Sequence, residues 1–227
     1  MNHPALVIFD MDGLMFDTEN ISHETWIETS EKFGFPMDRA ITDRFIGTTG
    51  KNVMRIMAEI YGLEVPLTEW REYQQALKAA KVDCTISKES FKKRGLYSLL
   101  KYLKSNNITA CVASCSEAYK VSKLLQETGT LEYFDFWISG DEVVCGKPEP
   151  EIFQKACNKA GIPPKQALVL EDSLSGIRAA YLAGIPSFFI PDRIEPNDEI
   201  KAKSDKIFDS LEEVKSYLSA IYKKSNN

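Results

Sequence analysis

The sequence lacks any apolar run near the roughly 18 residues that cross a membrane, and its 227 residues carry no excess of positive charge. The net charge is −5 at pH 7, which argues against nucleic acid or an anionic membrane surface as a partner. The chain starts Met-Asn-His-Pro with no basic leader or cleavage pattern, so we expect no secretory signal. We therefore expect no membrane and no nucleic acid among its partners.

Cysteine is scarce, and the cysteines do not show the paired spacing of a zinc site. An odd number of five also argues against a disulfide framework. We interpret them as reduced thiols of a cytoplasmic protein, which we expect to be a monomer. Apolar residues make up 44% and charged residues 27% of the chain, as in ordinary globular proteins. The five are Cys84, Cys111, Cys115, Cys145 and Cys157.

Short apolar runs separated by helical patterns organise most of the chain. The runs are continuous, which is typical of strands whose two faces are both covered. Between them, apolar residues recur with helical spacing, as in Leu96, Leu99, Leu100 and Leu103. Alternating strands and helices predict an α/β fold with a doubly wound parallel sheet. The five expected strands cover residues 5–9, 108–114, 136–139, 167–170 and 187–190.

One connection is much longer than a single crossover requires. Almost a hundred residues separate the first expected strand from the second, and they have the pattern of successive helices. One covers residues 21–33, another ends at Gly62, and a third begins near Thr68, which is a plausible N-cap, and continues towards Ala80. We therefore expect a helical domain over residues 16–89, inserted into a core of residues 1–15 and 90–227. Its aromatic residues, Trp26, Tyr61, Trp70 and Tyr73, should pack its interior, although one of them could reach substrate.

Two carboxylates follow the first expected strand. Asp10 and Asp12 stand at its C-terminal end, where open α/β sheets bind ligands. Alternation along an extended chain would aim both side chains to similar sides. Two negative charges in one small site need a cation or a shared proton, and a site made only of oxygens suits Mg²⁺. Asp12-Gly13 alone also fits an ordinary acidic turn, so other fragments must decide.

The second expected strand ends in small polar residues. Ser114, Cys115 and Ser116 follow it directly, and a hydroxyl with free backbone N–H groups before a helix can bind an anion. Ser116 would equally serve as a plain helix N-cap. This fragment alone leaves both interpretations open.

Two further fragments carry charge at positions that the fold would hold in place. Lys147 precedes Pro148 and Pro150, which restrict its approach to a helix and would hold an ammonium where a bound phosphate needs it. Glu171 and Asp172 end the fourth expected strand and repeat the arrangement of the first acidic pair. An acidic helix N-terminus also has a simple capping role, so the ordered set is more informative than each fragment.

Together these segments resemble the haloacid dehalogenase (HAD) superfamily, in particular the branch of β-phosphoglucomutase and small sugar-phosphate phosphatases. The resemblance covers the core and the size and position of the helical insert. It implies a Rossmann-like core, a helical cap domain and a phosphatase that uses Mg²⁺. The matching segments are residues 10–19 (DMDGLMFDTE), Ser114, residues 146–153 (GKPEPEIF) and residues 171–177 (EDSLSGI).

The resemblance also implies a role for each matching residue. Asp10 would be the nucleophile that forms an aspartyl-phosphate, and Asp12 the general acid and base. Ser114 would hold the phosphate, and Lys147 would neutralise its charge. Mg²⁺ would be bound by Asp10, by the backbone carbonyl of Asp12 and by Asp172, with Glu171 close by. Covalent catalysis of this kind splits a slow hydrolysis into two steps.

Differences within the family narrow the activity. A dehalogenase lacks the second aspartate, so Asp12 argues against dehalogenation. β-Phosphoglucomutases carry an arginine in a cap loop and a histidine soon after the Asp-Thr pair. Here the loop has no such arginine, and Ser22 stands where the histidine is expected, one residue before His23. We expect the loop to contact substrate together with Cys115, although Thr49 could simply cap a helix. The expected loop contacts are Gly47, Thr48, Thr49 and Lys51.

Three hypotheses remain at this point. The first is a phosphatase for a small phosphorylated metabolite, with a sugar phosphate as the expected substrate. The second is a phosphosugar mutase on the same scaffold, in which Lys51 replaces the missing arginine. The third is a receiver-type binding module controlled by phosphorylation, which also combines acids, a hydroxyl and a lysine. Receivers are nearer 120 residues and have no helical insert after the first strand, so the sequence favours the first hypothesis.

Overall fold

Within residues 3–225, which the computed structural model of the protein describes, six strands form one parallel sheet in the order β3-β2-β1-β4-β5-β6. This confirms the doubly wound, Rossmann-like α/β fold, because the order reverses direction beside the first strand. The ends of the expected core, residues 1–2 and 226–227, lie outside the described residues. The strands are β1 (Leu6–Phe9), β2 (Thr109–Ala113), β3 (Phe136–Ile138), β4 (Ala167–Glu171), β5 (Ser187–Phe189) and β6 (Lys206–Ile207).

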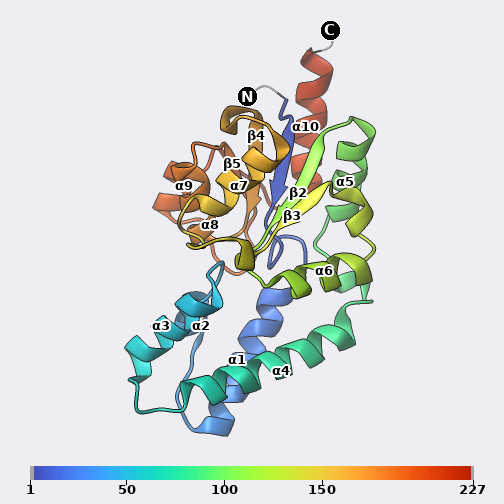
Figure 1. The fold of residues 1–227 in the computed structure, drawn as a ribbon. Helices are drawn as coiled ribbons and strands as arrows, with labels where there is room; N and C mark the ends of the chain where they lie inside the picture. Colours follow the sequence, from blue (N-terminus) through green and yellow to red (C-terminus); the bar gives the residue numbers. More distant parts are fainter. Residues whose placement is uncertain (1–2, 226–227) are drawn as a thin grey trace.

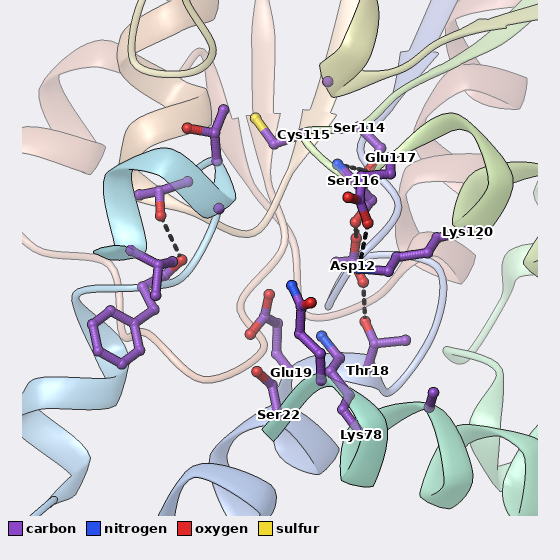
Figure 2. A pocket seen from close by; sticks show the side chains of 18 of the residues that line it. Asp12, Thr18, Glu19, Ser22, Lys78, Ser114, Cys115, Ser116, Glu117 and Lys120 are labelled. Atoms are coloured by element: carbon purple, nitrogen blue, oxygen red, sulfur yellow. Dashed lines mark hydrogen bonds and ion pairs between the residues drawn. The ribbon is translucent and has the colours of Figure 1, made fainter. Parts of the chain in front are cut away.

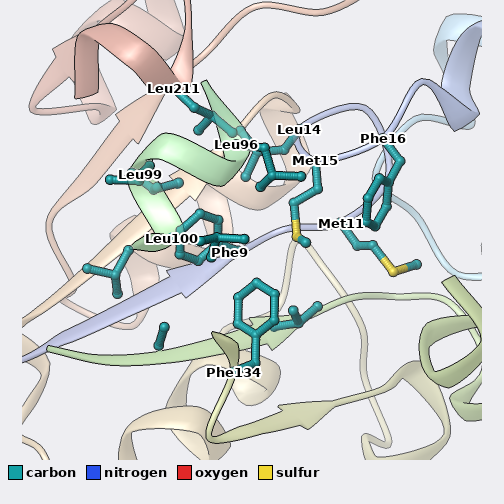
Figure 3. Packing of buried hydrophobic residues seen from close by; sticks show 14 of the residues in the cluster. Phe9, Met11, Leu14, Met15, Phe16, Leu96, Leu99, Leu100, Phe134 and Leu211 are labelled. Atoms are coloured by element: carbon teal, nitrogen blue, oxygen red, sulfur yellow. The ribbon is translucent and has the colours of Figure 1, made fainter. Parts of the chain in front are cut away.

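Helices cover both faces of the sheet (Figure 1). Val7 and Phe9 of β1 face the helices α5 (Leu96–Ser105), α6 (Ala118–Glu127) and α10 (Leu211–Ser225), and Figure 3 shows Phe9 packed among leucines of α5. Leu6 and Ile8 face α7 (Glu151–Ala160) and α8 (Leu174–Leu182). Alternate residues of a strand thus enter two separate apolar clusters, which is why the strands have continuous apolar sequences.

The register of the sheet brings three strand ends to one edge. Phe9 at the end of β1 is paired with Val112 of β2 and with Leu170 of β4. The residues that follow these positions therefore emerge side by side at the C-terminal edge of the sheet. The short helices α9 (Asp198–Lys203), η1 (Glu89–Phe91), η2 (Leu131–Tyr133), η3 (Gly140–Glu142) and η4 (Pro164–Gln166) complete the connections.

Four of the helices between β1 and β2 lie together below that edge in Figure 1: α1 (Thr18–Phe33), α2 (Arg39–Asp43), α3 (Gly50–Tyr61) and α4 (Leu67–Thr85). They have an apolar cluster of their own around Trp26 and Trp70, whose ring centroids are 6.3 Å apart. Tyr61 packs against Trp70, and Tyr73 against Phe33. The expected packing of the aromatic residues is therefore confirmed.

The expected N-cap of the third helix was wrong. Thr68 is not an N-cap, because α4 begins at Leu67 after Pro66 and continues to Thr85, beyond Ala80. Proline fixes φ near −65° and suits a helix start. The sequence analysis also missed the five-residue α2 and the two-residue β6. Segments of this length are too short to show a period.

Two chain segments join the helices to the sheet, and they run side by side. The Asp17 amide donates to the Phe91 carbonyl at 2.8 Å, and the Lys93 amide donates to the Met15 carbonyl at 2.9 Å. Because both crossings lie at one place, the four helices are connected to the sheet through a single narrow region. No helix within the described range has the length and apolar content needed to cross a membrane.

Candidate active site

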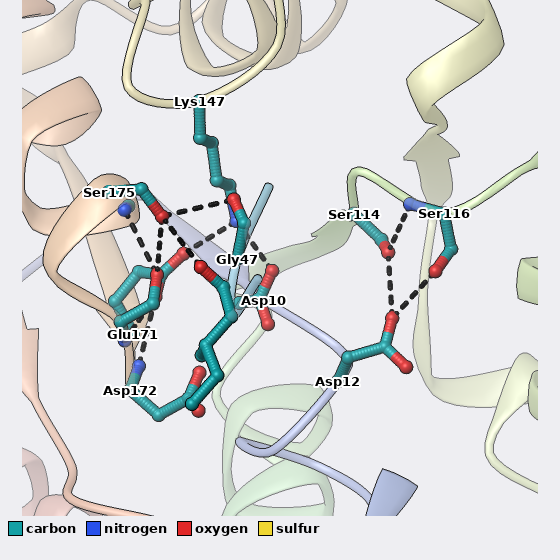
Figure 4. Close-up of polar contacts among 12 residues, drawn as sticks. Asp10, Asp12, Gly47, Ser114, Ser116, Lys147, Glu171, Asp172 and Ser175 are labelled. Atoms are coloured by element: carbon teal, nitrogen blue, oxygen red, sulfur yellow. Dashed lines mark hydrogen bonds and ion pairs between the residues drawn. The ribbon is translucent and has the colours of Figure 1, made fainter. Parts of the chain in front are cut away.

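A buried lysine joins two acids at the C-terminal edge of the sheet. Lys147 lies in the loop before α7, and its Nζ is 2.5 Å from Asp10 Oδ1 and 2.5 Å from Glu171 Oε1 (Figure 4). Its side chain is completely buried. The two carboxylates hold its pKa well above the usual range, although burial opposes this. The structure thus brings together three residues from segments far apart in the sequence.

Glu171 has both carboxylate oxygens engaged. Its Oε2 accepts hydrogen bonds from the backbone amides of Asp172 and Ser173, both at 2.9 Å, and from the Ser173 hydroxyl at 2.8 Å. A Cβ atom on Gly176 would lie only 1.8 Å from Glu171 Oε1. The start of α8 therefore approaches Glu171 as closely as a glycine permits, and Glu171 is held in place to orient Lys147.

Asp172 has no hydrogen-bond donor for either carboxylate oxygen within the described residues, although both oxygens are buried. Ligand oxygens of Asp10, Glu171 and Asp172 all lie within 4.8 Å of one another. Burial first, and then the charges of Glu171 and Asp10, raise the pKa of Asp172 well above its usual range. Burial also raises the pKa of Asp10, against the effect of Lys147. This crowded acidic group, with the two unpartnered oxygens of Asp172, fits a hard divalent cation.

Asp12 does not belong to this acidic group, although Asp10 and Asp12 line the same cavity. The strand ends at Phe9, so side-chain alternation no longer applies beyond it. The Asp12 carboxylate instead accepts hydrogen bonds from the Thr18 hydroxyl at 2.6 Å and the Ser116 hydroxyl at 2.7 Å. In Figure 4 it points away from Lys147, towards the end of β2.

Hydrogen bonds and nearby cations stabilise the charged form of Asp12. Burial raises its pKa, but the charge of Lys78, the hydroxyls of Thr18 and Ser116 and the charge of Lys120 outweigh burial, so the pKa is lowered. Asp10 and Asp12, two residues apart, therefore have pKa values shifted in opposite directions.

Ser114 and its neighbours line the same cavity at the end of β2. The buried Ser114 hydroxyl accepts a hydrogen bond from the Ser116 amide at 3.1 Å and lies 3.4 Å from Asp12 Oδ2. Ser116 is not the N-cap, because α6 is capped at Glu117. Burial raises the pKa of the Cys115 thiol to about 11. Cys115 therefore stays protonated at neutral pH.

A cavity of about 400 Å³ separates these residues from the four helices. The expected loop residues line it from the helical side, namely Gly47, Thr48, Thr49 and Lys51. Thr49 also caps α3, because its hydroxyl accepts from the Asn52 amide at 3.3 Å. The loop contacts the core directly, since the Ser175 hydroxyl donates to the Gly47 carbonyl at 3.0 Å.

Several lining residues were missed by the sequence analysis. Glu19 and Lys78 extend from α1 and α4 towards Asp12 (Figure 2). Arg71 also lines the cavity and precedes Lys78 on the same face of α4. Burial raises the pKa of Glu19 to about 7, opposed by Lys78 and supported by Asp12. Residues seven apart lie on one face of a helix, so the spacing of Arg71 and Lys78 was a sequence signal that both could line one site.

Comparison with known proteins gives the same family throughout. The model of the haloacid dehalogenase-like hydrolase family matches residues 7–190. A phosphorylated carbohydrates phosphatase of Thermotoga maritima is 30% identical over 81% of this chain and 83% of its own. A validoxylamine A 7′-phosphate phosphatase of Streptomyces hygroscopicus subsp. limoneus is 29% identical over 92% of this chain and 95% of its own.

Solved structures agree with the sequence comparison. The crystal structure of CbbY from Rhodobacter sphaeroides in complex with phosphate superposes with a TM-score of 0.78 and 26% identity, covering 93% of this chain and 96% of that one. The family model spans most of the chain, including β1, β2, β4 and the loop of Lys147. The chain therefore belongs to the haloacid dehalogenase-like hydrolase family.

Proposed function

We propose that this protein is a Mg²⁺-dependent phosphatase for a small phosphorylated metabolite, with a sugar phosphate as the substrate class. The observation that carries the proposal is the buried Lys147 between Asp10 and Glu171, next to the unpartnered carboxylate of Asp172. A phosphate placed there would meet a nucleophilic carboxylate, a fixed ammonium and a site for a cation. The phosphatase relatives support this activity.

Asp10 and Asp172, together with the backbone carbonyl of Asp12, are the proposed ligands of Mg²⁺, and Glu171 lies close by. Carboxylate and carbonyl oxygens are the ligands that this ion prefers, and the two unpartnered oxygens of Asp172 fit it. When bound, Mg²⁺ would offset part of the negative charge of the phosphate and of the surrounding carboxylates.

In the proposed mechanism, Lys147 holds Asp10 by Oδ1, and the carboxylate attacks phosphorus to form an aspartyl-phosphate. Ser114 binds a phosphate oxygen. Asp12 gives a proton to the leaving oxygen and then takes one from the water that hydrolyses the intermediate. The hydroxyls of Thr18 and Ser116 orient Asp12 for both steps.

The helices over residues 16–89 would act as a cap that encloses the substrate. The proposed substrate contacts are Gly47, Thr48, Thr49, Lys51 and Cys115, all of which line the cavity. Water is excluded best when the cap lies on the core, as the contact between Ser175 and Gly47 illustrates. We further propose a cytoplasmic monomer that binds no nucleic acid; size-exclusion chromatography with light scattering tests the oligomeric state.

The nucleophile gives the decisive test. Asp10→Asn should reduce hydrolysis of p-nitrophenyl phosphate at least about 1,000-fold, because the amide cannot form the acyl phosphate. Removal of divalent cations with EDTA should abolish turnover, and added Mg²⁺ should restore it. Asp209→Asn, an identical change at an exposed position, is the control and should leave turnover unchanged. Turnover by Asp10→Asn near the parent rate would contradict the proposal.

A mutase remains the second candidate because of unpaired cations in the cavity. Lys51, Arg71 and Lys78 line it, and none has a carboxylate partner within 4.0 Å among residues 3–225. Such cations would suit a second phosphate. β-Glucose 1-phosphate with a trace of the bisphosphate separates the activities, since a mutase yields glucose 6-phosphate and a phosphatase yields free phosphate.

A further inference from the structure

A fourth carboxylate lies beside the acidic group and belongs to none of the motifs described above. Asp192 is in the loop after β5, and its side chain is 7% exposed. Its Oδ1 accepts a hydrogen bond from Lys93 Nζ at 2.6 Å. Its Oδ2 is buried and has no hydrogen-bond partner within the described residues. One half of this carboxylate is therefore fixed, while the other half is left without a donor.

The unpartnered oxygen faces Asp172 across Gly13. A Cβ atom placed on Gly13 would lie 2.2 Å from Asp172 Oδ2 and 3.2 Å from Asp192 Oδ2. Both oxygens therefore border the small space that the glycine leaves open, and Gly13 has a φ of 88°, which disfavours any larger residue. Two buried carboxylate oxygens without donors therefore lie beside this space, Asp172 Oδ2 and Asp192 Oδ2.

Leaving these oxygens unpartnered destabilises the fold, because a buried acceptor without a donor has lost its hydrogen bonds to water. A direct bond to the cation would satisfy Asp172, but Asp192 lies further out. Among the described residues, the acidic group whose ligand oxygens all lie within 4.8 Å of one another contains Asp10, Glu171 and Asp172 and does not contain Asp192. A donor that reaches Asp192 must therefore lie between it and the cation.

We infer that Asp192 Oδ2 accepts a hydrogen bond from the hydration shell of the Mg²⁺ held by Asp10 and Asp172, and that Asp192 is a positioning residue of the metal site. This inference rests on the Mg²⁺ site of the proposed function. Mg²⁺ keeps several waters when proteins bind it, and outer partners of that kind orient the site and strengthen binding.

Lys93 makes the assignment specific to one oxygen. Its ammonium holds Asp192 Oδ1 and also lies 3.1 Å from Asp17 Oδ1, so it fixes the orientation that turns Oδ2 towards Asp172. Lys93 and Asp17 belong to the two segments that join the helices to the sheet. Asp192 thereby connects the metal site to the junction between the two parts of the molecule.

Isothermal titration of the metal-free protein with Mg²⁺ tests the inference. Asp192→Asn keeps the side-chain shape, removes the charge and leaves Lys93 paired with Asp17. We expect the Kd for Mg²⁺ to rise at least about tenfold, since changes to outer partners of a metal cost 10–100-fold in affinity. Asp209→Asn is the matched control and should keep the parent Kd. A fixed Mg²⁺ concentration should raise the Tm of Asp192→Asn less than it raises the Tm of the parent and of Asp209→Asn.

The outcomes distinguish this inference from the proposed function. If the parent protein does not bind Mg²⁺, both are overturned. If the parent binds and Asp192→Asn binds with the same Kd, only the inference is overturned, whatever happens to the Tm of the metal-free variant. Should Asp192→Asn fail to fold, Lys93→Gln/Asp192→Asn removes both charges of the ion pair together, and an unchanged Kd in that variant has the same meaning.

Discussion

At the scale of single residues, Asp10 and Asp12 show how neighbours in sequence acquire different chemistry. Asp10 lies beside Lys147 and the other acids, whereas Asp12 is surrounded by hydroxyls and by the cations Lys78 and Lys120. Different surroundings allow two carboxylates to have different protonation states, which acid–base catalysis requires. The lowered pKa of Asp12 in the free protein suits its proposed role as a base. Negative charge on a bound phosphate would raise that pKa towards the value that an acid needs.

Asp12→Asn should separate proton transfer from metal binding. We expect kcat to fall about 100- to 10,000-fold, the range typical of a lost general acid or base. The Kd for Mg²⁺ should change less than about twofold, because the proposed metal contact of Asp12 is its backbone carbonyl. Steady-state kinetics and calorimetric titration measure the two quantities. A large loss of Mg²⁺ affinity would show that the carboxylate itself binds the metal.

Glu19 should make stability depend on pH. Burial raises its pKa from 4.5 to about 7, so its ionised form is disfavoured in the folded state. The free energy of unfolding is therefore highest at a pH below the pKa of Glu19 in the unfolded protein. It falls as the pH rises towards the pKa of Glu19 in the folded protein. Glu19→Gln should therefore gain on the order of 2 kcal/mol relative to the parent between pH 5 and pH 8. Urea unfolding in EDTA measures this, and equal pH dependence of the two proteins would refute it.

The sequence could predict some residues of the candidate site but not the side-chain partners of others. Asp10, Ser114, Lys147 and Asp172 follow apolar strands or precede a proline-bounded helix, so their convergence at the strand ends follows from the α/β pattern. Ser116 was considered only as an anion contact or a cap, and its bond to Asp12 depends on the turn after β1. Side-chain partners across such turns are set by distances that sequence spacing does not encode.

At the scale of elements, burial decides what could be predicted. The strands β1 and β4 are buried on both faces, so each has an apolar sequence that is recognisable on its own. Both residues of β6 are exposed, and this edge strand depends on pairing with β5. The start of α4 was placed to within one residue, but its N-cap is Pro66 and not Thr68.

The first turn of α8 should tolerate no side chain at Gly176. In Gly176→Ala the new Cβ would lie 1.8 Å from Glu171 Oε1, so Glu171 must move and Lys147 loses a partner. We expect a loss of about 1–3 kcal/mol in the free energy of unfolding, as for overpacked cores, and at least a tenfold lower kcat. Urea unfolding and phosphatase assays measure these changes.

Gly50→Ala is the matched control for a helical glycine. Its Cβ would meet nothing closer than Arg71 Nη2 at 3.9 Å, and it stands at the first position of α3. We expect its free energy of unfolding to stay within about 0.5–1 kcal/mol of the parent, because alanine is the better helix former. Equal destabilisation of both variants would indicate that the contact with Glu171 has no special role.

At the scale of the whole molecule, polar contacts join the helices α1 to α4 to the core around the cavity. Arg193, in the loop after β5, pairs with Asp43 of α2 at 3.0 Å, and Ser175 bonds the loop of Gly47. Asp192 is the neighbour of Arg193 in the same loop. One core loop thus contacts α2 through Arg193 and borders the acidic group through Asp192, so the proposed metal site and the helical insert share a structural element.

Mg²⁺ should raise the Tm of the parent protein, whereas Asp172→Asn should have a higher Tm without the metal and gain nothing from it. Asp172 has a raised pKa, so the metal-free protein loses stability as the pH rises above about 4, the ordinary value for Asp. At neutral pH, Asp172→Asn should therefore have a higher Tm than the parent in EDTA. Mg²⁺ at about 100 times its Kd should raise the parent Tm by about 5–10 °C and leave Asp172→Asn unchanged. Calorimetry at pH 5 and pH 8, with and without Mg²⁺, measures all four conditions. A lower Tm for Asp172→Asn in EDTA would mean that its carboxylate stabilises the fold without a metal, which would contradict the electrostatic basis of the proposed site.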